Sequence, residues 1–200
     1  MPCYPYCVIA GGCSRTVRVV GGKAKGRRLR GTISPGARPT TGRVRAAIFN
    51  IIRPELFEGG RVLDLYAGSG SLGIESLSRG AAWADFVEQN RRQCEVIRGN
   101  LLNAGFDTQA RVHCAEVEKY LTALTGPYRL VLMDPPYKFL ELGDFLESLA
   151  GVDGLVEDDG TVVVGHSRHL ELQSDYGSLH LFSHRRYGDN VVEFFRKGVS

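Results

Sequence analysis

The segment Asp134-Pro135-Pro136-Tyr137 brings a carboxylate, a backbone carbonyl and an aromatic ring together directly after an apolar run. The apolar residues 130–133 predict a strand that is covered on both faces, as in a parallel sheet. Proline has no N–H and a fixed φ, so the two prolines must end that strand. We therefore expect the quartet at the carboxyl edge of a sheet, where open α/β folds bind ligands. A tight strand exit without a ligand is the alternative for so short a motif.

A second candidate site lies in residues 61–76, where a predicted strand runs into a glycine-rich turn and then into a helix. Gly68, Gly70 and Gly73 satisfy the pattern G-x-G-x-x-G, in which glycine lets the backbone turn sharply or approach a ligand closely. Glu88 ends the next predicted strand, where an acid that binds a ribose is expected. Taken alone, these features fit a dinucleotide site, and a tight turn without a ligand is the alternative.

Asp64 helps to separate two classes of cofactor. It lies four residues before Gly68, and a carboxylate at that place repels the pyrophosphate of a dinucleotide. It suits a ligand that carries an ammonium and a sulfonium group, as S-adenosylmethionine does. Glu116 opens the helix after the third strand and is a candidate for binding an adenine amino group. An acid in a first helical turn is also favourable through the helix dipole alone, so both interpretations stay open.

Strands and helices alternate from Arg61 onward, which predicts a parallel sheet with helices on both faces. The last two strands are separated only by YGD, so we expect them to form an antiparallel hairpin at one edge of the sheet. The predicted class is α/β, a Rossmann-like fold with a seven-stranded, mostly parallel sheet. The expected strands cover residues 61–66, 84–88, 109–113, 129–133, 160–165, 178–183 and 190–196. The expected helices cover residues 71–79, 90–104, 116–124 and 139–150, with a short one near 168–173.

The N-terminal part of the chain is strongly basic. Residues 1–54 carry eleven Lys and Arg residues and no Asp or Glu, although the formal net charge of the 200-residue chain is only +3. A basic arm on an acidic body is typical of nucleic-acid-binding proteins, whereas a solvated basic face is the common alternative. Residues 17–33 predict a basic hairpin or small sheet. A helix is expected over residues 43–52, with one apolar face formed by Val44, Ala47, Ile48 and Ile51.

Composition restricts the number of domains and the compartment. The length and the 43% hydrophobic content suit one globular domain with a small appendage. No apolar stretch reaches the roughly 20 residues needed to cross a bilayer, and the first 16 residues lack the features of a signal peptide. Five cysteines without a C-x-x-C pair favour reduced thiols over a zinc site. We expect a cytoplasmic protein that holds no metal.

The order of these motifs resembles that of class I S-adenosylmethionine-dependent methyltransferases that modify amino groups, whose fourth motif is [DNS]-P-P-[YFW]. More closely, the chain resembles the RsmD family of bacterial methyltransferases, which act on guanine N2 in 16S ribosomal RNA. The resemblance covers residues 17–197 and depends on RVVGGKAKGRRL, RPTTGRVRAAIFNII, VLDLYAGSGSLGIESLSRGA, LVLMDPPY and RRYGD. The chain departs from the family at Gly42 and Ala46, where acids are usual, which puts the contacts of those acids in doubt. Residues 1–16 have no recognised counterpart, and we expect them to be upstream sequence read in frame.

The resemblance implies three parts: an extension at 1–16, a basic RNA-binding extension at 17–55 and a methyltransferase domain at 56–200. It implies catalytic roles for Asp134, Pro135, Pro136 and Tyr137. It implies S-adenosyl-L-methionine as the cofactor, bound by Asp64, Tyr66, Ala67, Gly68, Ser69, Gly70, Glu88, Gln89, Glu116 and Asp134. It implies RNA contacts from Lys23, Lys25, Arg27, Arg28, Arg38, Thr40, Arg43 and Arg45, the last two projecting from the basic helix.

The implied chemistry is transfer of a methyl group to an exocyclic amine. Asp134 and the Pro135 carbonyl are expected to accept the two amine hydrogens, while Tyr137 stacks on the target base. The expected partner is 16S rRNA, in the small ribosomal subunit or an assembly intermediate, with the protein acting as a monomer away from membranes. Two alternatives stay open: an amino-methyltransferase acting on DNA or protein, and an RNA-binding module whose cofactor pocket is silent.

Overall fold

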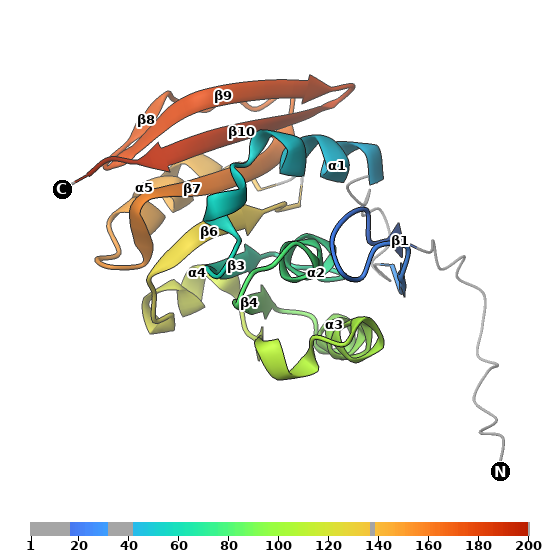
Figure 1. Cartoon of the computed structure of the whole chain (residues 1–200). Coiled ribbons are helices and arrows are strands. Elements are labelled where there is room, and N and C mark those ends of the chain that lie inside the picture. The colour runs from blue at the N-terminus through green and yellow to red at the C-terminus, as the bar shows by residue number, and fades with distance from the viewer. Residues whose placement is uncertain (1–16, 32–41, 137–138, 200) are drawn as a thin grey trace, which may run out of the picture.

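The computed structural model describes residues 17–31, 42–136 and 139–199, and its centre is one eight-stranded sheet (Figure 1). The strand order is β5-β4-β3-β6-β7-β10-β9-β8. The first five strands in this order pair in parallel, and the remaining pairs are antiparallel. The strands are β3 (Arg61–Leu65), β4 (Trp83–Glu88), β5 (Ala110–Cys114), β6 (Tyr128–Met133), β7 (Val156–Ser167), β8 (Asp175–Tyr176), β9 (Leu179–Tyr187) and β10 (Asn190–Lys197).

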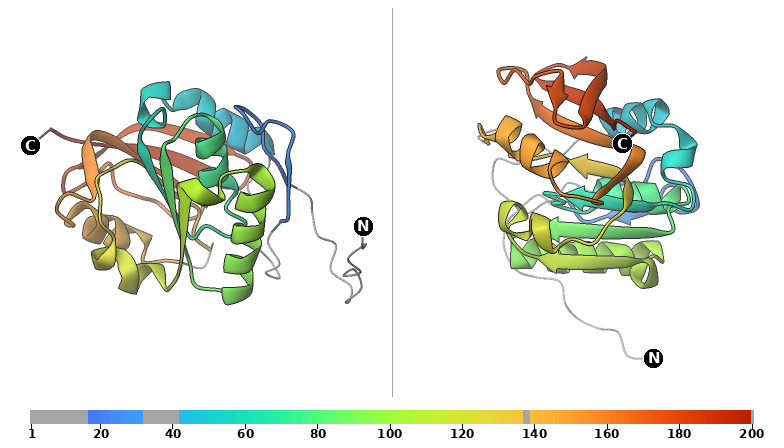
Figure 2. Two further views of the ribbon diagram at one scale, coloured as in Figure 1. Left: turned by 60° about the horizontal axis from the view of Figure 1, so that its bottom comes forward. Right: turned by 90° about the vertical axis from the view of Figure 1, so that its left-hand side faces the viewer.

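Helices cover both faces of the sheet, as two views of the molecule show (Figures 1 and 2). One face carries α1 (Gly42–Ile51), α2 (Ser71–Ser78) and α3 (Arg91–Ala104), and the other carries α4 (Val117–Tyr120) and α5 (Leu142–Ala150). Short 3₁₀ turns lie at η1 (Pro54–Leu56), η2 (Asp107–Gln109) and η3 (Leu121–Ala123). None of the described helices is long and apolar enough to cross a membrane. This arrangement confirms the prediction of an α/β fold with a mostly parallel sheet and helices on both faces.

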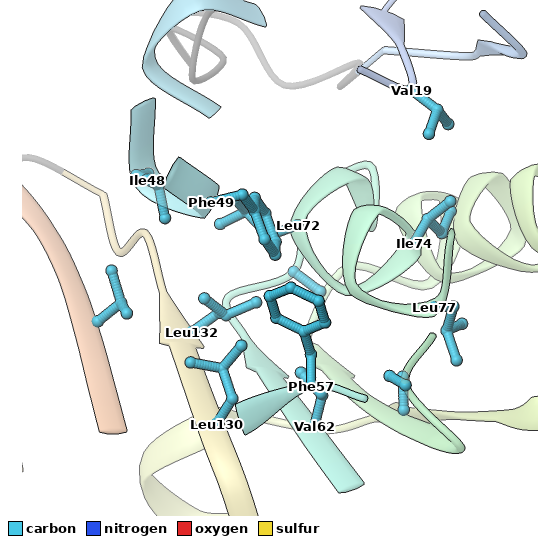
Figure 3. Packing of buried hydrophobic residues seen from close by; sticks show 14 of the residues in the cluster. Val19, Ile48, Phe49, Phe57, Val62, Leu72, Ile74, Leu77, Leu130 and Leu132 are labelled. Carbon is cyan, nitrogen blue, oxygen red and sulfur yellow. The ribbon is translucent and has the colours of Figure 1, made fainter. Parts of the chain in front are cut away.

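Alternation along the strands divides the core into two hydrophobic clusters, because successive side chains point to opposite faces. Leu130 and Leu132 of β6 pack under α1 and α2, whereas Val131 and Met133 pack toward α4 and α5. Figure 3 shows the first cluster, in which Phe49 of α1 lies over Phe57 beside Leu72. The centres of the two phenyl rings are 6.0 Å apart in an edge-to-face arrangement. This packing fixes α1 against the sheet.

Two features differ from the expected elements. The predicted helix near 168–173 is wrong, since residues 168–174 form a turn and an extended connection. The Arg168 N–H donates to the Asp189 carbonyl at 2.9 Å, outside any helix. Leu170 and Leu172, two residues apart, both pack against the second hydrophobic cluster, which is the spacing of an extended chain. The connection then adds β8, a two-residue edge strand, to the seven predicted ones. The predicted hairpin of β9 and β10 is confirmed, although β10 lies between β7 and β9.

The basic segment 17–31 is attached to the sheet through α2. It forms the predicted small antiparallel pair, β1 (Val17–Arg18) with β2 (Arg28–Leu29). The fully buried Glu75 of α2 accepts hydrogen bonds from the N–H groups of Val20 and Gly21, both at 2.7 Å. Arg79 donates to the same carboxylate at 2.9 Å. The predicted boundary between residues 17–55 and 56–200 stays a prediction, and side chains from both parts share the first hydrophobic cluster.

Ser78 makes a second attachment at the end of α2. Its hydroxyl donates to the Gly21 carbonyl at 2.6 Å and accepts from the Ala24 N–H at 2.9 Å. Gly22 has φ +72°, and a Cβ there would lie 1.8 Å from the Ser78 carbonyl oxygen. Only glycine therefore lets this loop approach the helix so closely.

We expect Glu75→Ala to lower the free energy of unfolding by about 3 kcal/mol, because two buried N–H groups and Arg79 lose their acceptor. Urea unfolding followed by circular dichroism measures this loss. Glu147→Ala, which changes an exposed acid of α5, is the matched control and should leave stability nearly unchanged. Equal stability of the Glu75→Ala variant and the original chain would contradict the role of Glu75 as an attachment.

Candidate active site

Parallel strands bring the predicted site residues to one edge of the sheet. The carboxyl ends of β3, β4, β5 and β6 are aligned by their register, so the loops that follow these strands lie at the same edge. These loops carry residues 66–70, 88–90, 115–116 and 134–136. Asp134, Pro135 and Pro136 therefore lie at the carboxyl edge of the sheet, as expected for a segment that follows a parallel strand.

The loop after β3 turns by left-handed backbone at three positions. Gly68 and Gly70 have φ of +53° and +73°, and Tyr66 has φ +54°. A positive φ is ordinary for glycine but strained for tyrosine, and such strain gathers at functional sites. The Tyr66 hydroxyl donates to Glu118 at 2.7 Å, and its ring packs against those of Phe139 and Phe145. These contacts hold the strained residue in place.

Asp64 is buried beneath this loop with 1% of its surface exposed. It accepts a hydrogen bond from the Gly73 N–H at 2.8 Å, at the start of α2. Burial raises the pKa of Asp64 well above its usual range, and the nearby carboxylates of Asp134 and Glu88 raise it further. The third glycine is required by packing, since a Cβ at Gly73 would lie 2.4 Å from the Phe86 ring. Three acids thus meet around the glycine loop, which favours a cationic ligand over a pyrophosphate.

The remaining predicted cofactor residues lie around the same loop. Glu88 accepts from the N–H of Gly68 and from that of Asn90, both at 2.9 Å, so it connects the ends of β3 and β4. Gln89 is exposed, and Ala67 and Ser69 are buried in the loop. Glu116 is exposed at the N-terminus of α4 and forms an ion pair with Lys119 at 2.5 Å, without a capping hydrogen bond.

Asp134 lies at the end of β6 and faces a small pocket, which we call the acceptor pocket. The pocket is lined by Asp134, by Gly165 and His166 of β7, by Asn190 of β10 and by the apolar residues of α1 and α2 near them. A Cβ at Gly165 would come within 2.8 Å of the Asp134 carboxylate, so glycine allows the strand to approach the acid. Pro135 is buried and Pro136 exposed. Tyr137 lies outside the described residues.

Five of the eight predicted RNA-binding residues are exposed: Lys23, Lys25, Arg27, Arg28 and Arg43. Arg38 and Thr40 lie outside the described residues. The prediction that Arg45 projects from the basic helix is wrong, because only 2% of its surface is exposed. Its guanidinium donates to the Arg18 carbonyl at 2.6 Å, and the segment 17–31 covers it. Burial lowers the pKa of Arg45, while the charge of Glu75 acts in the opposite direction.

Sequence reasoning missed Asn100, which connects the basic segment with the glycine loop. Its side-chain amide donates to the carbonyls of Arg30 and Ser69, both at 2.9 Å, and its oxygen accepts from the Arg30 N–H at 2.7 Å. A signal was present, since Asn100 is a polar residue on the buried face of α3, beside Ile97 and Leu101. Gly165 was also missed, and no local pattern marks it.

The chain is similar to known proteins over most of its length. The model of the family described as "Conserved hypothetical protein 95" matches residues 17–196. The chain belongs to this family. The E. coli protein "Ribosomal RNA small subunit methyltransferase D" is 35% identical over 194 residues, covering 90% of this chain and 96% of the relative. YlbH of Bacillus subtilis is 38% identical over 185 residues, covering 90% of this chain and 99% of YlbH.

Solved structures of similar proteins have the same fold. A hypothetical protein from Thermus thermophilus superimposes with a TM-score of 0.75 at 32% identity, over 92% of this chain and 99% of that one. The yhhF structure from Escherichia coli gives 0.81 at 27% identity, with the same coverage. The predicted family and the predicted dependence on S-adenosylmethionine are confirmed.

We expect Asp64→Asn to flatten the pH dependence of stability. A raised carboxyl pKa in the folded state means that wild-type stability declines as the pH rises from the ordinary aspartate value of about 4 toward the folded-state value. The variant cannot ionise there, so its free energy of unfolding should exceed that of wild type at pH 8 and match it at low pH. Urea unfolding across this pH range measures the difference. Asp107→Asn, at an exposed site, is the control, and parallel pH profiles for all three proteins would contradict the expectation.

Arg43 and Arg45 offer a matched pair on one helix. Arg43→Ala should weaken RNA binding without loss of stability and reduce its dependence on salt, because one phosphate contact is lost. Arg45→Ala should lower the free energy of unfolding by about 2 kcal/mol, since a buried contact to the Arg18 carbonyl disappears. Filter binding at several salt concentrations and urea unfolding separate the two effects. Loss of stability in Arg43→Ala, or weaker RNA binding by a fully stable Arg45→Ala, would contradict these two roles.

Proposed function

We propose that this protein transfers a methyl group from S-adenosylmethionine to the exocyclic N2 of a guanine in 16S rRNA of the small ribosomal subunit. The observation that carries the proposal is the position of Asp134 and Pro135. They follow β6 at the sheet edge that holds the glycine loop, and Asp134 faces the acceptor pocket. An acid at this place has an acceptor site on one side and the cofactor loop on the other.

The residues at the glycine loop fit the cofactor. Gly68 and Gly70 have no side chain that would block a close approach to the loop, Glu88 at the end of β4 is our candidate for the ribose, and the carboxylates of Asp64 and Asp134 suit positive charge. When bound, the cofactor supplies a methyl group on a sulfonium that is already a good leaving group. The protein therefore needs no covalent nucleophile of its own.

Asp134 and Pro135 have the chemistry to orient an amine. The exocyclic nitrogen of guanine is a weak nucleophile, because its lone pair is delocalised into the ring. The Asp134 carboxylate and the Pro135 carbonyl are both acceptors, and they take the two amine hydrogens and stabilise the positive charge that grows on nitrogen. Proline at 135 and 136 removes two competing N–H donors and stiffens the loop.

Two observations support RNA as the substrate class. The exposed Lys and Arg side chains of residues 23–28 give this segment a positive surface. Hydrogen bonds to Glu75 and Asn100 hold the basic segment against α2 and α3, the helices next to the glycine loop. Phosphate contacts of this kind give affinity without reading sequence. The E. coli relative named as a small-subunit rRNA methyltransferase is similar to this chain over nearly its whole length. The base has to be unpaired or flipped out to reach Asp134.

Methyl transfer from labelled S-adenosylmethionine tests the proposal. The acceptors are unmodified small ribosomal subunits, free 16S RNA and duplex DNA, and nucleosides from each are separated after digestion. We expect label in N2-methylguanosine of the ribosomal RNA and a loss of about 100-fold or more with Asp134→Ala, since a positioned charge acceptor is removed. Asp144→Ala, an exposed acid in the first turn of α5, is the control that keeps activity.

Three other outcomes would each contradict a different part of the proposed function. Label only in DNA would keep the chemistry and overturn the substrate. Label at another atom of guanine would overturn the assignment of N2. Absence of label on every acceptor, with cofactor binding intact, would favour the silent RNA-binding module.

A further inference from the structure

A second polar pocket lies at the opposite edge of the sheet from Asp134. Its lining includes Arg61 and Trp83 at the starts of β3 and β4, together with side chains of β5, α4 and η3, and its volume is about 490 Å³. Its charged and aromatic lining comprises Arg61, Trp83, Asp85, Arg111, His113 and Tyr120. None of its lining residues lines the acceptor pocket. The site described above therefore does not include this pocket, which we call the Asp85 pocket.

The buried carboxylate of Asp85 organises the lining. One of its oxygens accepts from the Trp83 indole at 2.9 Å, from the Tyr128 hydroxyl at 2.9 Å and from Arg61 at 3.1 Å. The other lies 2.9 Å from His113 Nε2. Four side chains from four strands are thus held in fixed positions around one acid.

The network extends from His113 to the pocket wall. His113 Nδ1 lies 3.0 Å from the Tyr120 hydroxyl, and the two rings are 5.0 Å apart. Burial by itself raises the pKa of Asp85, but hydrogen bonds from His113, Tyr128 and Arg61 outweigh it and leave the pKa below its usual range. Asp85 therefore stays ionised at neutral pH, and the charge of Arg61 balances it at 3.1 Å.

Arg111 leaves the pocket with a positive charge. It is exposed at the rim, and its side chain makes no ion pair or hydrogen bond with the part of the chain that the structure describes. Guanidinium groups recognise phosphate through paired N–H donors, and aromatic rings recognise bases by stacking. In this one pocket, Arg111 and Arg61 supply guanidinium groups for a phosphate, and Trp83 and Tyr120 supply aromatic rings for a base.

We propose that the Asp85 pocket is a binding site for a nucleoside monophosphate group, with the phosphate on Arg111 and Arg61 and the base on Trp83 or Tyr120. Two sources share this chemistry: a nucleotide of the RNA chain, and a free mononucleotide. This proposal is argued from the residues that line the Asp85 pocket and does not depend on the proposed methyl-transfer reaction.

Trp83 makes the test direct, because it is the only tryptophan of the chain and it lines the pocket. Titration with GMP should change Trp83 fluorescence to saturation, whereas guanosine should bind roughly tenfold more weakly, because it lacks the charged phosphate. Arg111→Ala should weaken GMP binding by a similar factor. Arg92→Ala, an exposed arginine of α3, is the matched control and should behave as wild type.

A second titration distinguishes the two sources. If a short single-stranded RNA saturates the Trp83 signal at lower concentration than GMP, RNA is the ligand, and Arg111→Ala should then raise KM for ribosomal RNA without changing kcat. If GMP binds and the RNA does not, a free nucleotide is the ligand. An unchanged Trp83 signal with GMP and with RNA, in a protein that still binds S-adenosylmethionine, would overturn the proposal. Equal binding of GMP by wild type and Arg111→Ala would overturn the assigned phosphate contact.

Discussion

The two parts of this molecule meet at the carboxylate of Glu75. This buried acid on α2 accepts two backbone N–H groups of the basic segment and the guanidinium of Arg79. A buried charge is costly unless hydrogen bonds surround it, and here two of the three partners come from a segment 54 or 55 residues away in sequence. Because α2 begins at the glycine loop and ends at this attachment, the basic surface and the cofactor loop are held by the same helix.

The direction of the parallel strands gives the two edges of the sheet different chemistry. At the carboxyl edge, Asp64, Glu88 and Asp134 gather around a loop with left-handed backbone, and such a site favours a cationic cofactor. At the amino edge, one ionised acid is surrounded by donors and by Arg111 at the rim, and such a site favours an anion. One sheet therefore carries two binding environments, and the two pockets share no lining residue.

Much of the fold was predictable because its signals are local. The alternation of strands and helices after Arg61 predicted the seven strands, and the family motifs marked the glycine loop and Asp134. The helix near 168–173 was wrong because a tertiary bond from Arg168 to Asp189 and alternate packing of two leucines decide that segment. Arg45 was assigned to RNA because arginine is usually exposed, and only the covering segment 17–31 makes it a buried residue.

By itself, the sequence determined the α/β alternation, the family, the cofactor loop and the basic character of the N-terminal part. These properties depend on residue type and short spacing, which the chain carries without folding. The tertiary structure decided which charges are buried, that Glu75 and Asn100 attach the basic segment, that Gly165 allows β7 to approach Asp134, and that Asp85 gathers four donors. Apart from the bond between Trp83 and Asp85, these contacts join residues distant in sequence, and only the packed sheet brings their atoms close together.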